Sequence, residues 1–437
     1  MIFHLSGVHV PHRKNTAGTQ AERMDTPKCV TIPMAMHIGK PAVPCVKVGD
    51  TVGVGTIIAE QDGFISSPIY SSVSGKVTKI SDILLSNGSK APAITVESDG
   101  EMTPDDSIAP PSLSSKEDFI EAVRKSGVVG LGGAGFPTYV KFNVPNEKIE
   151  ELIINGAECE PYITSDSNTM ENLSEDIAFG LSLIEKYLGV KKIIIGIEKN
   201  KKKSISVMNT LASNDPCVSV KVLPSVYPQG GEKVLVYHTT GKVIPVGKLP
   251  IDVGCIVCNC TTVAAIGNFV KTGMPLVKKC VTVDGGAIAS PKNVIVPIGT
   301  SIAELIEFCG GLKCQPKKVL YGGPMMGIAI PDTSAPILKN TNAILALTEK
   351  ELNDAEPSAC IRCGSCLNIC PFGINPAGIA RALDKKDVQT MEKLGANLCM
   401  ECGCCSFVCP AHIQLVQKNK LAKAVIKEEK AKEGSAK

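Results

Sequence analysis

The sequence predicts a multidomain protein that combines α/β and all-β regions with a small helical domain near its C-terminal end. Three observations predict this class. Turn residues separate short Val- and Ile-rich runs through the first hundred residues, strand and helix patterns alternate from about residue 150 to 223, and cysteines cluster after residue 350. At 437 residues the chain is long enough for three or four domains.

Charge and composition argue against two kinds of partner. The chain has 46 basic and 43 acidic residues, no Trp and only 4% aromatic residues, so we expect no nucleic-acid partner. No apolar run approaches the ~20 residues that cross a bilayer, so we expect no direct membrane span. Nineteen cysteines and an N-terminus without a signal-peptide pattern predict a reducing, cytoplasmic location with metal ligands.

Residues 1–100 predict a β domain. Turn signals recur between its short apolar runs, and the stretches 44–52 and 71–77 resemble the hairpin halves of a biotinyl/lipoyl-type β-sandwich, also called a barrel-sandwich hybrid. Lys76 follows Gly75 but lacks the flanking Met of a modified lysine, so we expect a covering or docking domain instead of a cofactor carrier. A polar, Pro- and Ser-rich linker follows over residues 101–116.

Hydrophobic periodicity divides the rest of the chain. Residues 116–250 predict an α/β domain, with helices at 116–125 (N-cap Ser114 or Ser115), 171–188 and 200–211 and strands at 152–154, 192–197 and 218–223. Residues 251–335 predict a second β-rich domain, with strands at 281–283 and 294–297 and a helix at 301–309. We expect a helical domain over 350–416 and a charged tail, frayed or disordered, over 417–437.

The cysteines after residue 350 form two runs of the pattern C-x2-C-x2-C-x3-C-P. This is the run of bacterial two-cluster ferredoxins, in which the fourth cysteine of each run binds the other cluster. It predicts two [4Fe–4S] clusters, one held by Cys360, Cys363, Cys366 and Cys409, the other by Cys399, Cys402, Cys405 and Cys370. Zinc ribbons use two C-x2-C pairs, which these quartets do not match. Cys404, beside Cys405, is expected to be a spare small residue, and a swap between the two stays open.

A glycine-rich loop precedes the alternating region. Gly130–Gly135 matches G-x-G-x-x-G but follows a predicted helix, so the dinucleotide-fold context is missing. Glycines still let backbone N–H groups approach a phosphate, and Pro137 suits the first turn of a following helix. The alternative is a turn that binds nothing.

Polar groups follow the predicted strand at 152–154. Glu158 and Glu160 stand where an open α/β sheet places ligand-binding groups, and either can hydrogen-bond ribose hydroxyls or a carboxamide. A second glycine turn, Gly230-Gly231-Glu232, carries another carboxylate. Each carboxylate taken singly is more simply a solvated loop charge.

Four motifs together resemble a known family. Gly132-Gly-Ala-Gly-Phe-Pro-Thr138 with Lys141 looks like the flavin loop of the NADH-oxidising subunit of respiratory NADH dehydrogenase. Asn155-x-x-Glu158-x-Glu160, Gly230-Gly231-Glu232 and Asn259-x-Thr261-Thr262 resemble the later motifs of that family. With the β domain and the ferredoxin runs added, the chain to about residue 415 resembles the RnfC family of Rnf electron-transport complexes.

The resemblance implies a function. RnfC proteins are peripheral NADH dehydrogenase subunits with FMN and two [4Fe–4S] clusters, so we expect electrons to pass from NADH through FMN and the clusters to a partner. It also implies that 251–335 is a β-grasp domain of the SLBB type. The expected cofactor-binding residues are Gly132, Gly133, Gly135, Phe136, Thr138, Lys141, Asn155, Gly231, Glu232, Asn259 and Thr262 for FMN, with Glu158 and Glu160 contacting NADH. No side chain is needed as an acid or base for hydride transfer.

The sequence leaves the partner and two departures from the family open. An Rnf-type protein would bind other subunits of a membrane complex, peripherally on the cytoplasmic face. Soluble relatives of the family instead feed a reductase, such as the proline-reductase-associated electron transfer protein or a cobalamin-reducing flavoprotein. Residues 6–14 depart from the usual start of the family, and Cys255, Cys258 and Cys260 surround Asn259, either as buried packing residues or as a redox-active pair. A non-enzymatic ferredoxin-like adaptor is the rival from another class.

Overall fold

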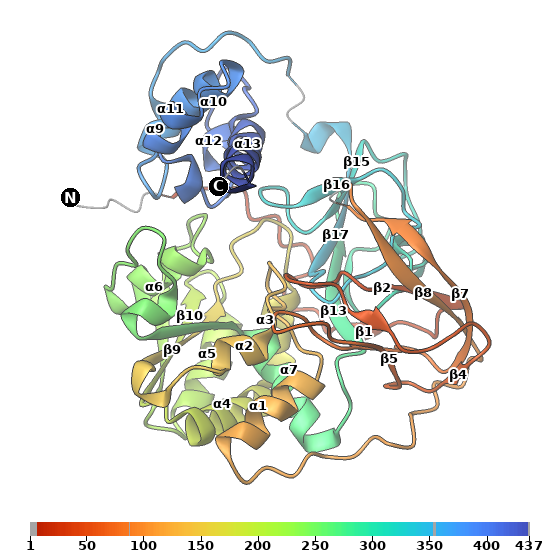
Figure 1. Ribbon diagram of the computed structural model, residues 1–437. Coiled ribbons are helices and arrows are strands. Elements are labelled where there is room, and N and C mark those ends of the chain that lie inside the picture. Colours follow the sequence, from red (N-terminus) through yellow and green to blue (C-terminus); the bar gives the residue numbers. More distant parts are fainter. Residues whose placement is uncertain (1–6, 87, 353–354, 436–437) are drawn as a thin grey trace.

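The computed structural model describes residues 7–86, 88–352 and 355–435. Figure 1 shows the β domain in red and orange, the α/β domain in yellow and green, a second β region in teal, and the helical C-terminal domain in blue at the top. The order of domains confirms the predicted fold class. No helix in the described part of the chain is long and apolar enough to cross a membrane.

The β domain consists of two small antiparallel sheets packed on a shared core. One sheet has the order β2-β8-β7-β4 and the other β3-β5-β6. Their strands are β2 Cys29–Pro33, β3 Val43–Pro44, β4 Thr51–Val52, β5 Ile57–Glu60, β6 Ile69–Tyr70, β7 Gly75–Leu84 and β8 Lys90–Ser98. Ile32, Ile58 and Ile94 are fully buried between them. Lys76 lies inside β7, paired with Thr51 and Glu97, and not at the tip of a hairpin.

Residues 7–23 lie outside these two sheets, and we call them the N-terminal strap. Val8 pairs with Tyr227 of the α/β domain, and the His12 carbonyl accepts a hydrogen bond from the backbone N–H of Tyr162 at 2.9 Å. Strand β1 (Glu22–Arg23) then runs parallel to β14 (Lys292–Pro297) of the second β region. The strap's backbone groups therefore find partners in the two neighbouring domains.

The α/β domain is built on the parallel sheet β11-β10-β9-β12. Its strands are β9 Glu151–Gly156, β10 Lys192–Glu198, β11 Val218–Leu223 and β12 Cys255–Asn259. Its helices are α1 Lys116–Lys125, α2 Thr138–Phe142, α3 Ser165–Asn172, α4 Ser174–Leu188, α5 Lys202–Ala212, α6 Glu232–Thr240 and α7 Cys260–Thr272, with 3-10 turns η1 Asn146–Lys148 and η2 Pro250–Val253.

Two boundaries in this domain differ from expectation. The helix expected at 171–188 is two helices, since Leu173 leaves helical geometry between α3 and α4. The domain also continues past residue 250, because β12 and α7 complete the parallel sheet and its helical cover. Gly180 on α4 lets α7 approach closely, since a Cβ there would lie 2.4 Å from the carbonyl oxygen of Val263.

The second β region is the six-stranded sheet β1-β14-β13-β17-β15-β16. Besides β1 and β14 it contains β13 Lys278–Asp284, β15 Lys318–Tyr321, β16 Ile328–Ile330 and β17 Ala343–Leu347, with helix α8 Ile302–Phe308 against it. The buried side chains Val281, Val294, Leu305 and Ile344 form its core. The region extends beyond the expected end at residue 335, because the fully buried strand β17 lies between β13 and β15.

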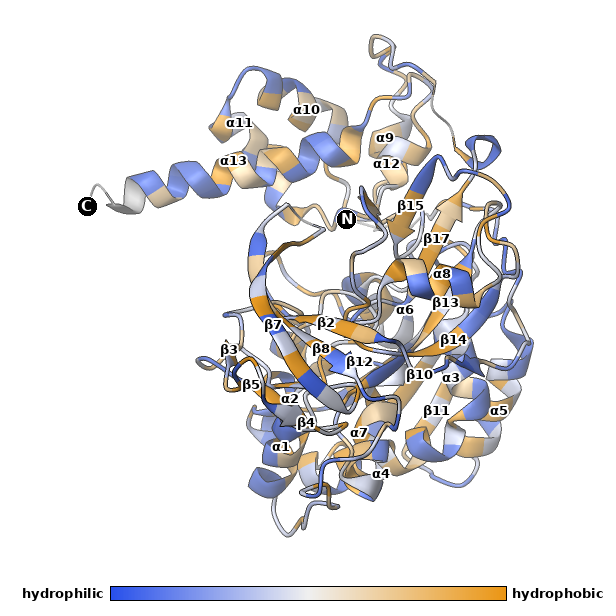
Figure 2. Cartoon of the chain, turned by 90° about the vertical axis from the view of Figure 1, so that its right-hand side faces the viewer, coloured by the Kyte–Doolittle hydropathy of each residue, from blue (hydrophilic) through white to orange (hydrophobic). Residues whose placement is uncertain are grey.

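The C-terminal domain is helical. It comprises the turns η3 Glu349–Glu351 and η4 Ala396–Leu398 and the helices α9 Ser365–Asn368, α10 Pro376–Asp384, α11 Val388–Lys393, α12 Cys404–Phe407 and α13 Leu415–Ser435. The expected charged tail is helix α13, which packs on α10, α11 and α12 and buries Ala422 and Ile426 in the domain core. Only its far end projects, as a mostly hydrophilic helix (Figure 2). Residues 436–437 lie outside the described part of the chain.

Candidate functional site

Four cysteines from both runs line one cavity in the C-terminal domain. Cys360, Cys363 and Cys366 come from the loop before α9 and from α9 itself, and Cys409 comes from the end of the second run. The cavity has a volume of about 210 Å³. Cys360 and Cys363 are exposed to solvent, so this site lies at the molecular surface. The grouping is the one that cross-ligation predicts.

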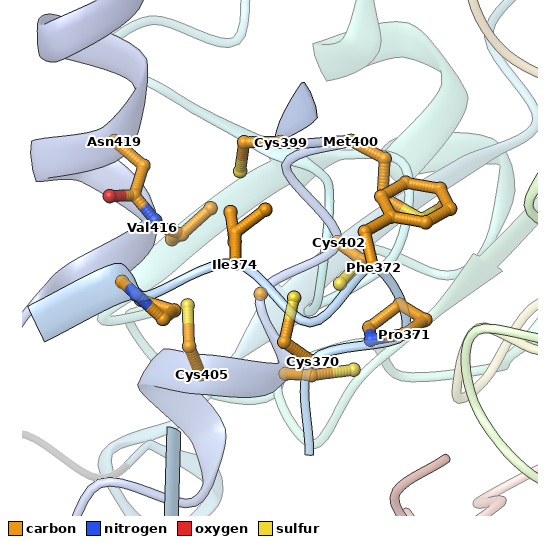
Figure 3. Close-up of a pocket in the computed structure, with 13 residues that line it drawn as sticks. Cys370, Pro371, Phe372, Ile374, Cys399, Met400, Cys402, Cys405, Val416 and Asn419 are labelled. Carbon is orange, nitrogen blue, oxygen red and sulfur yellow. The ribbon is translucent and has the colours of Figure 1, made fainter. Parts of the chain in front are cut away.

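The remaining cysteines of the runs line a second, more enclosed cavity. Figure 3 shows Cys370, Cys399, Cys402 and Cys405 around it, with Phe372, Ile374 and Val416 among the apolar side chains of its wall. Burial raises the pKa of Cys370, Cys399 and Cys405, for Cys405 to about 12. The pKa of Cys402 is instead lowered, chiefly by a hydrogen bond with the Cys404 side chain. Four cysteine sulfurs around one apolar cavity are the donor set that an iron–sulfur cluster needs, and binding of the cationic metal favours their thiolate forms.

Cys404 also lines the second cavity, where its side chain is hydrogen-bonded to that of Cys402. Its Sγ lies 3.9 Å from the carbonyl oxygen of Tyr227, and the side chain is buried among Val8, Val10 and Tyr227. This setting is that of a small packing residue, as expected, with four other cysteines already grouped around the cavity.

A third and larger cavity, of about 590 Å³, lies at the carboxyl ends of the parallel strands. This edge is where open α/β sheets bind ligands. Eight of the residues expected to bind FMN or NADH line it: Gly132, Gly133, Asn155, Glu158, Glu160, Gly231, Glu232 and Asn259. The second β region closes the other side with Tyr321, Gly322, Gly323 and Met326.

Five expected residues, Gly135, Phe136, Thr138, Lys141 and Thr262, are not among those lining the cavity. The Thr262 hydroxyl accepts a hydrogen bond from the Leu131 N–H at 3.0 Å, and the Phe136 carbonyl accepts one from the Gly130 N–H at 2.8 Å, so both shape the glycine loop. Lys141 donates to the Val257 carbonyl at 3.1 Å and lies 3.4 Å from the Glu232 carboxylate, which does line the cavity. These residues support the wall from behind.

The glycine loop itself is open to the cavity. A Cβ at Gly133 would meet no atom within 4 Å, whereas one at Gly132 would lie 2.6 Å from Asn259 Nδ2. The helix expected after Pro137 is the five-residue α2, whose first N–H, on Thr138, already bonds the Val128 carbonyl. Anion binding at that helix end is therefore not supported, and the loop backbone is what faces the cavity.

Both asparagines expected at FMN direct their amides to neighbouring loops. Asn155 donates to the Gly230 carbonyl at 2.9 Å and so joins the end of β9 to the second glycine turn. Asn259 caps α7 by accepting from the Thr261 N–H at 2.9 Å, and its Nδ2 donates to Asp166 at 2.7 Å. They position the cavity wall in this structure.

The two glutamates on the loop after β9 are also hydrogen-bonded. Glu158 is buried and accepts from the Asp166 N–H at 2.7 Å and from the Ser167 hydroxyl at 2.8 Å. Glu160 accepts from the backbone N–H groups of Met325 and Met326 at 3.0 and 2.8 Å, which ties this loop to the second β region. Burial raises the pKa of both carboxyls, for Glu160 to about 7.

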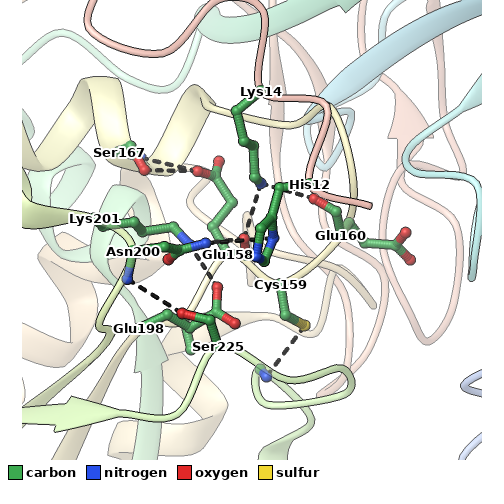
Figure 4. A network of polar contacts seen from close by, with 12 residues as sticks. His12, Lys14, Glu158, Cys159, Glu160, Ser167, Glu198, Asn200, Lys201 and Ser225 are labelled. Carbon is green, nitrogen blue, oxygen red and sulfur yellow. Dashed lines mark hydrogen bonds and ion pairs between the residues drawn. The ribbon is translucent and has the colours of Figure 1, made fainter. Parts of the chain in front are cut away.

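Two lysines that no sequence motif indicated hold this loop from behind (Figure 4). Lys14 of the N-terminal strap donates to the carbonyls of Glu158 at 3.0 Å, of Glu160 at 2.7 Å and of Ile163. Lys201 donates to the same Glu158 carbonyl at 3.0 Å and pairs with the buried Glu198 at 2.5 Å. No local pattern links residue 14 to residue 158, so spacing offered no signal for this contact.

The large cavity and the enclosed cysteine cavity share a wall. Met400 lines both of them. Tyr227 lines the large cavity, and its hydroxyl donates to the carbonyl of Cys402 at 2.7 Å. A group bound at the glycine loop and one bound by the second cysteine set would therefore be neighbours.

The three thiols around Asn259 are packing residues. Cys255, Cys258 and Cys260 are 0%, 4% and 0% exposed, and none is among the residues that line the large cavity. Burial raises the pKa of Cys255 and Cys258 to about 11 and also raises the pKa of Cys260. Thiols that stay protonated and enclosed are poor redox groups, which favours the packing alternative.

Comparison with protein families assigns a description to each region. Residues 3–101 match the RnfC barrel sandwich hybrid domain, residues 123–268 the Nuo51 FMN-binding domain, residues 280–329 the SLBB domain and residues 356–413 the 4Fe-4S dicluster domain. These matches agree in kind and order with the predicted fold class.

Curated relatives match nearly the whole chain. The C subunit of the proton-translocating ferredoxin:NAD(+) oxidoreductase complex of Clostridium ljungdahlii is 43% identical, over 90% of this chain and 86% of the relative. The C subunit of the Na(+)-translocating ferredoxin:NAD(+) oxidoreductase complex of Acetobacterium woodii is 42% identical, over 86% of each. The C subunit of the ion-translocating oxidoreductase complex of Rhodobacter capsulatus is 38% identical, over 98% of this chain and 83% of the relative.

A solved structure resembles the fold at low identity. An NAD+-reducing [NiFe]-hydrogenase chain in the air-oxidized state superposes with a TM-score of 0.51 and 17% identity, covering 71% of this chain. This chain spans 61% of that chain's length. Because the identity is only 17%, the likeness concerns the fold alone.

Proposed function

This chain belongs to the RnfC family of ion-translocating ferredoxin:NAD(+) oxidoreductase complexes, and from that membership we propose that it is the NADH-oxidising flavo-iron–sulfur subunit of such a complex. The observation that carries the proposal is the shared wall. A cavity in an FMN-binding-type domain touches, through Met400 and Tyr227, a cavity lined by four cluster cysteines. Electrons can pass from a flavin to a cluster only when the two groups are close together. Two cavities with unrelated roles would have no reason to share a wall.

The large cavity suits a flavin mononucleotide and a nicotinamide nucleotide. Its volume falls within the ~300–1,000 Å³ typical of ligand pockets, and Gly133 leaves backbone open at its wall, since a Cβ there would meet no atom within 4 Å. Gly231 instead lets Met400 pack closely, because a Cβ there would lie 2.3 Å from the Met400 methyl group. When bound, FMN takes up a hydride's two electrons from NADH and releases them singly to the one-electron clusters.

Residue roles follow from placement. Gly132 and Gly133 would hold the FMN phosphate with their backbone N–H groups, while Asn155 would fix the second glycine turn and Asn259 the start of α7. Lys141 orients Glu232 from behind the wall. We assign Glu158 and Glu160, on the loop after β9, to the nicotinamide nucleotide, and Gly135, Phe136, Thr138 and Thr262 to the support of the glycine loop.

The order of the clusters also follows from placement. The set Cys370, Cys399, Cys402 and Cys405 lies against the flavin cavity and is the first acceptor. The set Cys360, Cys363, Cys366 and Cys409 is the exit, because Cys360 and Cys363 are exposed and Ile361 beside them is 66% exposed. An exposed cluster edge rimmed by apolar residues suits docking of a partner that takes or gives electrons.

Other subunits of a membrane complex are the proposed partners. The curated relatives are subunits of ion-translocating complexes, which favours such partners over a soluble reductase. Attachment is then peripheral, on the cytoplasmic face, and passes through those subunits.

The test is anaerobic reduction of the purified protein carrying iron, sulfide and FMN. NADH should bleach both the flavin and the cluster absorbance. Retention of clusters without bound flavin and without bleaching would favour the adaptor that binds no nucleotide.

A double variant distinguishes NADH binding from FMN binding. Glu158→Gln with Glu160→Gln should weaken NADH oxidation while FMN stays bound, because glutamine keeps the size but loses the charge. The exposed Glu117→Gln is the matched control and should leave both unchanged. Equal loss of flavin and activity would contradict the assignment of these carboxylates to NADH.

A further inference from the structure

Helix α13 carries a buried amide without a hydrogen-bond partner. Asn419 is 0% exposed, and neither its Nδ2 nor its Oδ1 has a partner among the described residues. Most buried side-chain amides in folded proteins are hydrogen-bonded, because an unpaired one has lost water without replacing it. An orphaned amide of this kind indicates that a bound group supplies the missing partner.

The amide belongs to the wall of the enclosed cysteine cavity. Figure 3 shows Asn419 beside Val416, with its amide toward the space that Cys399 and Cys405 border. The other residues that line this cavity are cysteines, glycine, prolines, aliphatic residues, Met400 and Phe372. Asn419 is thus the one side chain of this wall that has a strong hydrogen-bond donor to offer.

The internal repeat of the domain puts a different residue at the matching position of the other cluster site. Asn419 follows Cys409 at the same spacing at which Ala380 follows Cys370. Val416 and Ala377 are related in the same way; Val416 lines the enclosed cavity and Ala377 the exposed one. The exposed cavity has polar side chains of its own, Asn375 and Arg381, at other positions of its wall.

We propose that Asn419 Nδ2 donates a hydrogen bond to a sulfur of the cluster held by Cys370, Cys399, Cys402 and Cys405, and thereby raises the reduction potential of that cluster. Cysteine and sulfide sulfurs accept hydrogen bonds, and their negative charge grows when the cluster takes up an electron. A donor therefore stabilises the reduced form more than the oxidised form. This inference rests on the proposed function, since it needs the clusters in place.

The decisive variant is Asn419→Leu, which keeps the approximate volume and removes the donor. Both clusters of the holoprotein are titrated with dithionite under electron paramagnetic resonance. We expect the Cys370 cluster to show about tenfold less reduced form at a fixed potential, a fall in midpoint of about 59 mV for one electron. The midpoint of the Cys360 cluster should stay unchanged, as should both midpoints in the control Gln417→Leu, an exposed amide on the same helix.

The outcomes separate the inference from the function on which it rests. Unchanged midpoints in a variant that retains eight irons, as the two clusters require, would overturn the hydrogen bond and leave the electron route intact. Absence of clusters or of NADH reduction in the wild-type protein would instead overturn the proposed function. If the leucine variant loses iron, Asn419→Ala is titrated in its place, and loss of iron there too would show an assembly role and refute the tuning role.

Discussion

The clearest energetic prediction concerns Lys14, whose ammonium holds the loop after β9 from the N-terminal strap. Lys14→Met keeps the aliphatic stem and removes the donor of three hydrogen bonds to backbone carbonyls. The Glu158 carbonyl keeps a partner, because Lys201 also donates to it. The carbonyls of Glu160 and Ile163 lose this donor.

The magnitude follows from those two carbonyls. A buried acceptor left without its donor costs about 1–3 kcal/mol, and two such groups cost about 2–6 kcal/mol. In the wild type, desolvation of the buried ammonium is unfavourable and lowers the pKa of Lys14. The variant buries no ammonium, and this gain offsets part of the cost of the lost hydrogen bonds. We expect a net local destabilisation of about 2–3 kcal/mol, which corresponds to about 30- to 150-fold more frequent opening of the loop.

Hydrogen–deuterium exchange measures this directly. Amides of residues 157–164 should exchange faster in Lys14→Met by that factor, while the strands of the β domain keep their protection. The control is Lys40→Met, whose ammonium is 64% exposed and pairs only with Asp62 at the surface. If residues 157–164 exchanged at the wild-type rate in the Lys14→Met variant, the idea that the strap holds this loop would be refuted.

Three further predictions concern the clusters and a carboxyl group. Cys409→Ser should impair the cluster of Cys360, Cys363 and Cys366 more than its neighbour, which iron analysis and electron paramagnetic resonance can measure; selective damage to the other cluster would contradict cross-ligation. Cys404→Ala should leave both cluster signals in place, because its thiol faces the Tyr227 carbonyl. For Glu160, the folded pKa of about 7 lies above the usual 4.5, so its contribution to stability is present below pH 4.5 and is lost as pH rises through 7. The free energy of unfolding of the wild type should therefore fall by about 2–3 kcal/mol more between pH 5 and 8 than that of Glu160→Gln.

Local signals made much of the fold predictable. Helix α1 forms over the expected residues because Ser115 accepts from the Asp118 N–H and Asp118 returns the bond, a capping box readable from adjacent residues. Strand β10 contains a run of buried isoleucines, and β11 alternates valine with the polar Ser219 and Lys221 and has the expected bounds. The cysteine grouping was also predictable, since ligand type and spacing together specify the cross-over between runs.

What the sequence did not reveal depends on contacts between distant residues. The order of residues gives no sign that Met400 separates two cavities or that Lys14 reaches the Glu158 loop. Helix α13 was expected to be a solvated tail because Lys and Glu dominate it, yet Ala422 and Ile426 suffice to dock it on α10 and α11. Asn419 was overlooked for the same reason, since its setting is visible only once that helix is placed.

The strap has a consequence for how the polypeptide matures during synthesis. Ribosomes release the N-terminus first, and domains generally fold in the order in which they emerge. Val8 is synthesised long before its partner Tyr227, and Glu22 long before its partner Val294. The strap can pair only once those partners have been translated, so its contact with the FMN-binding domain forms after residue 227 has emerged.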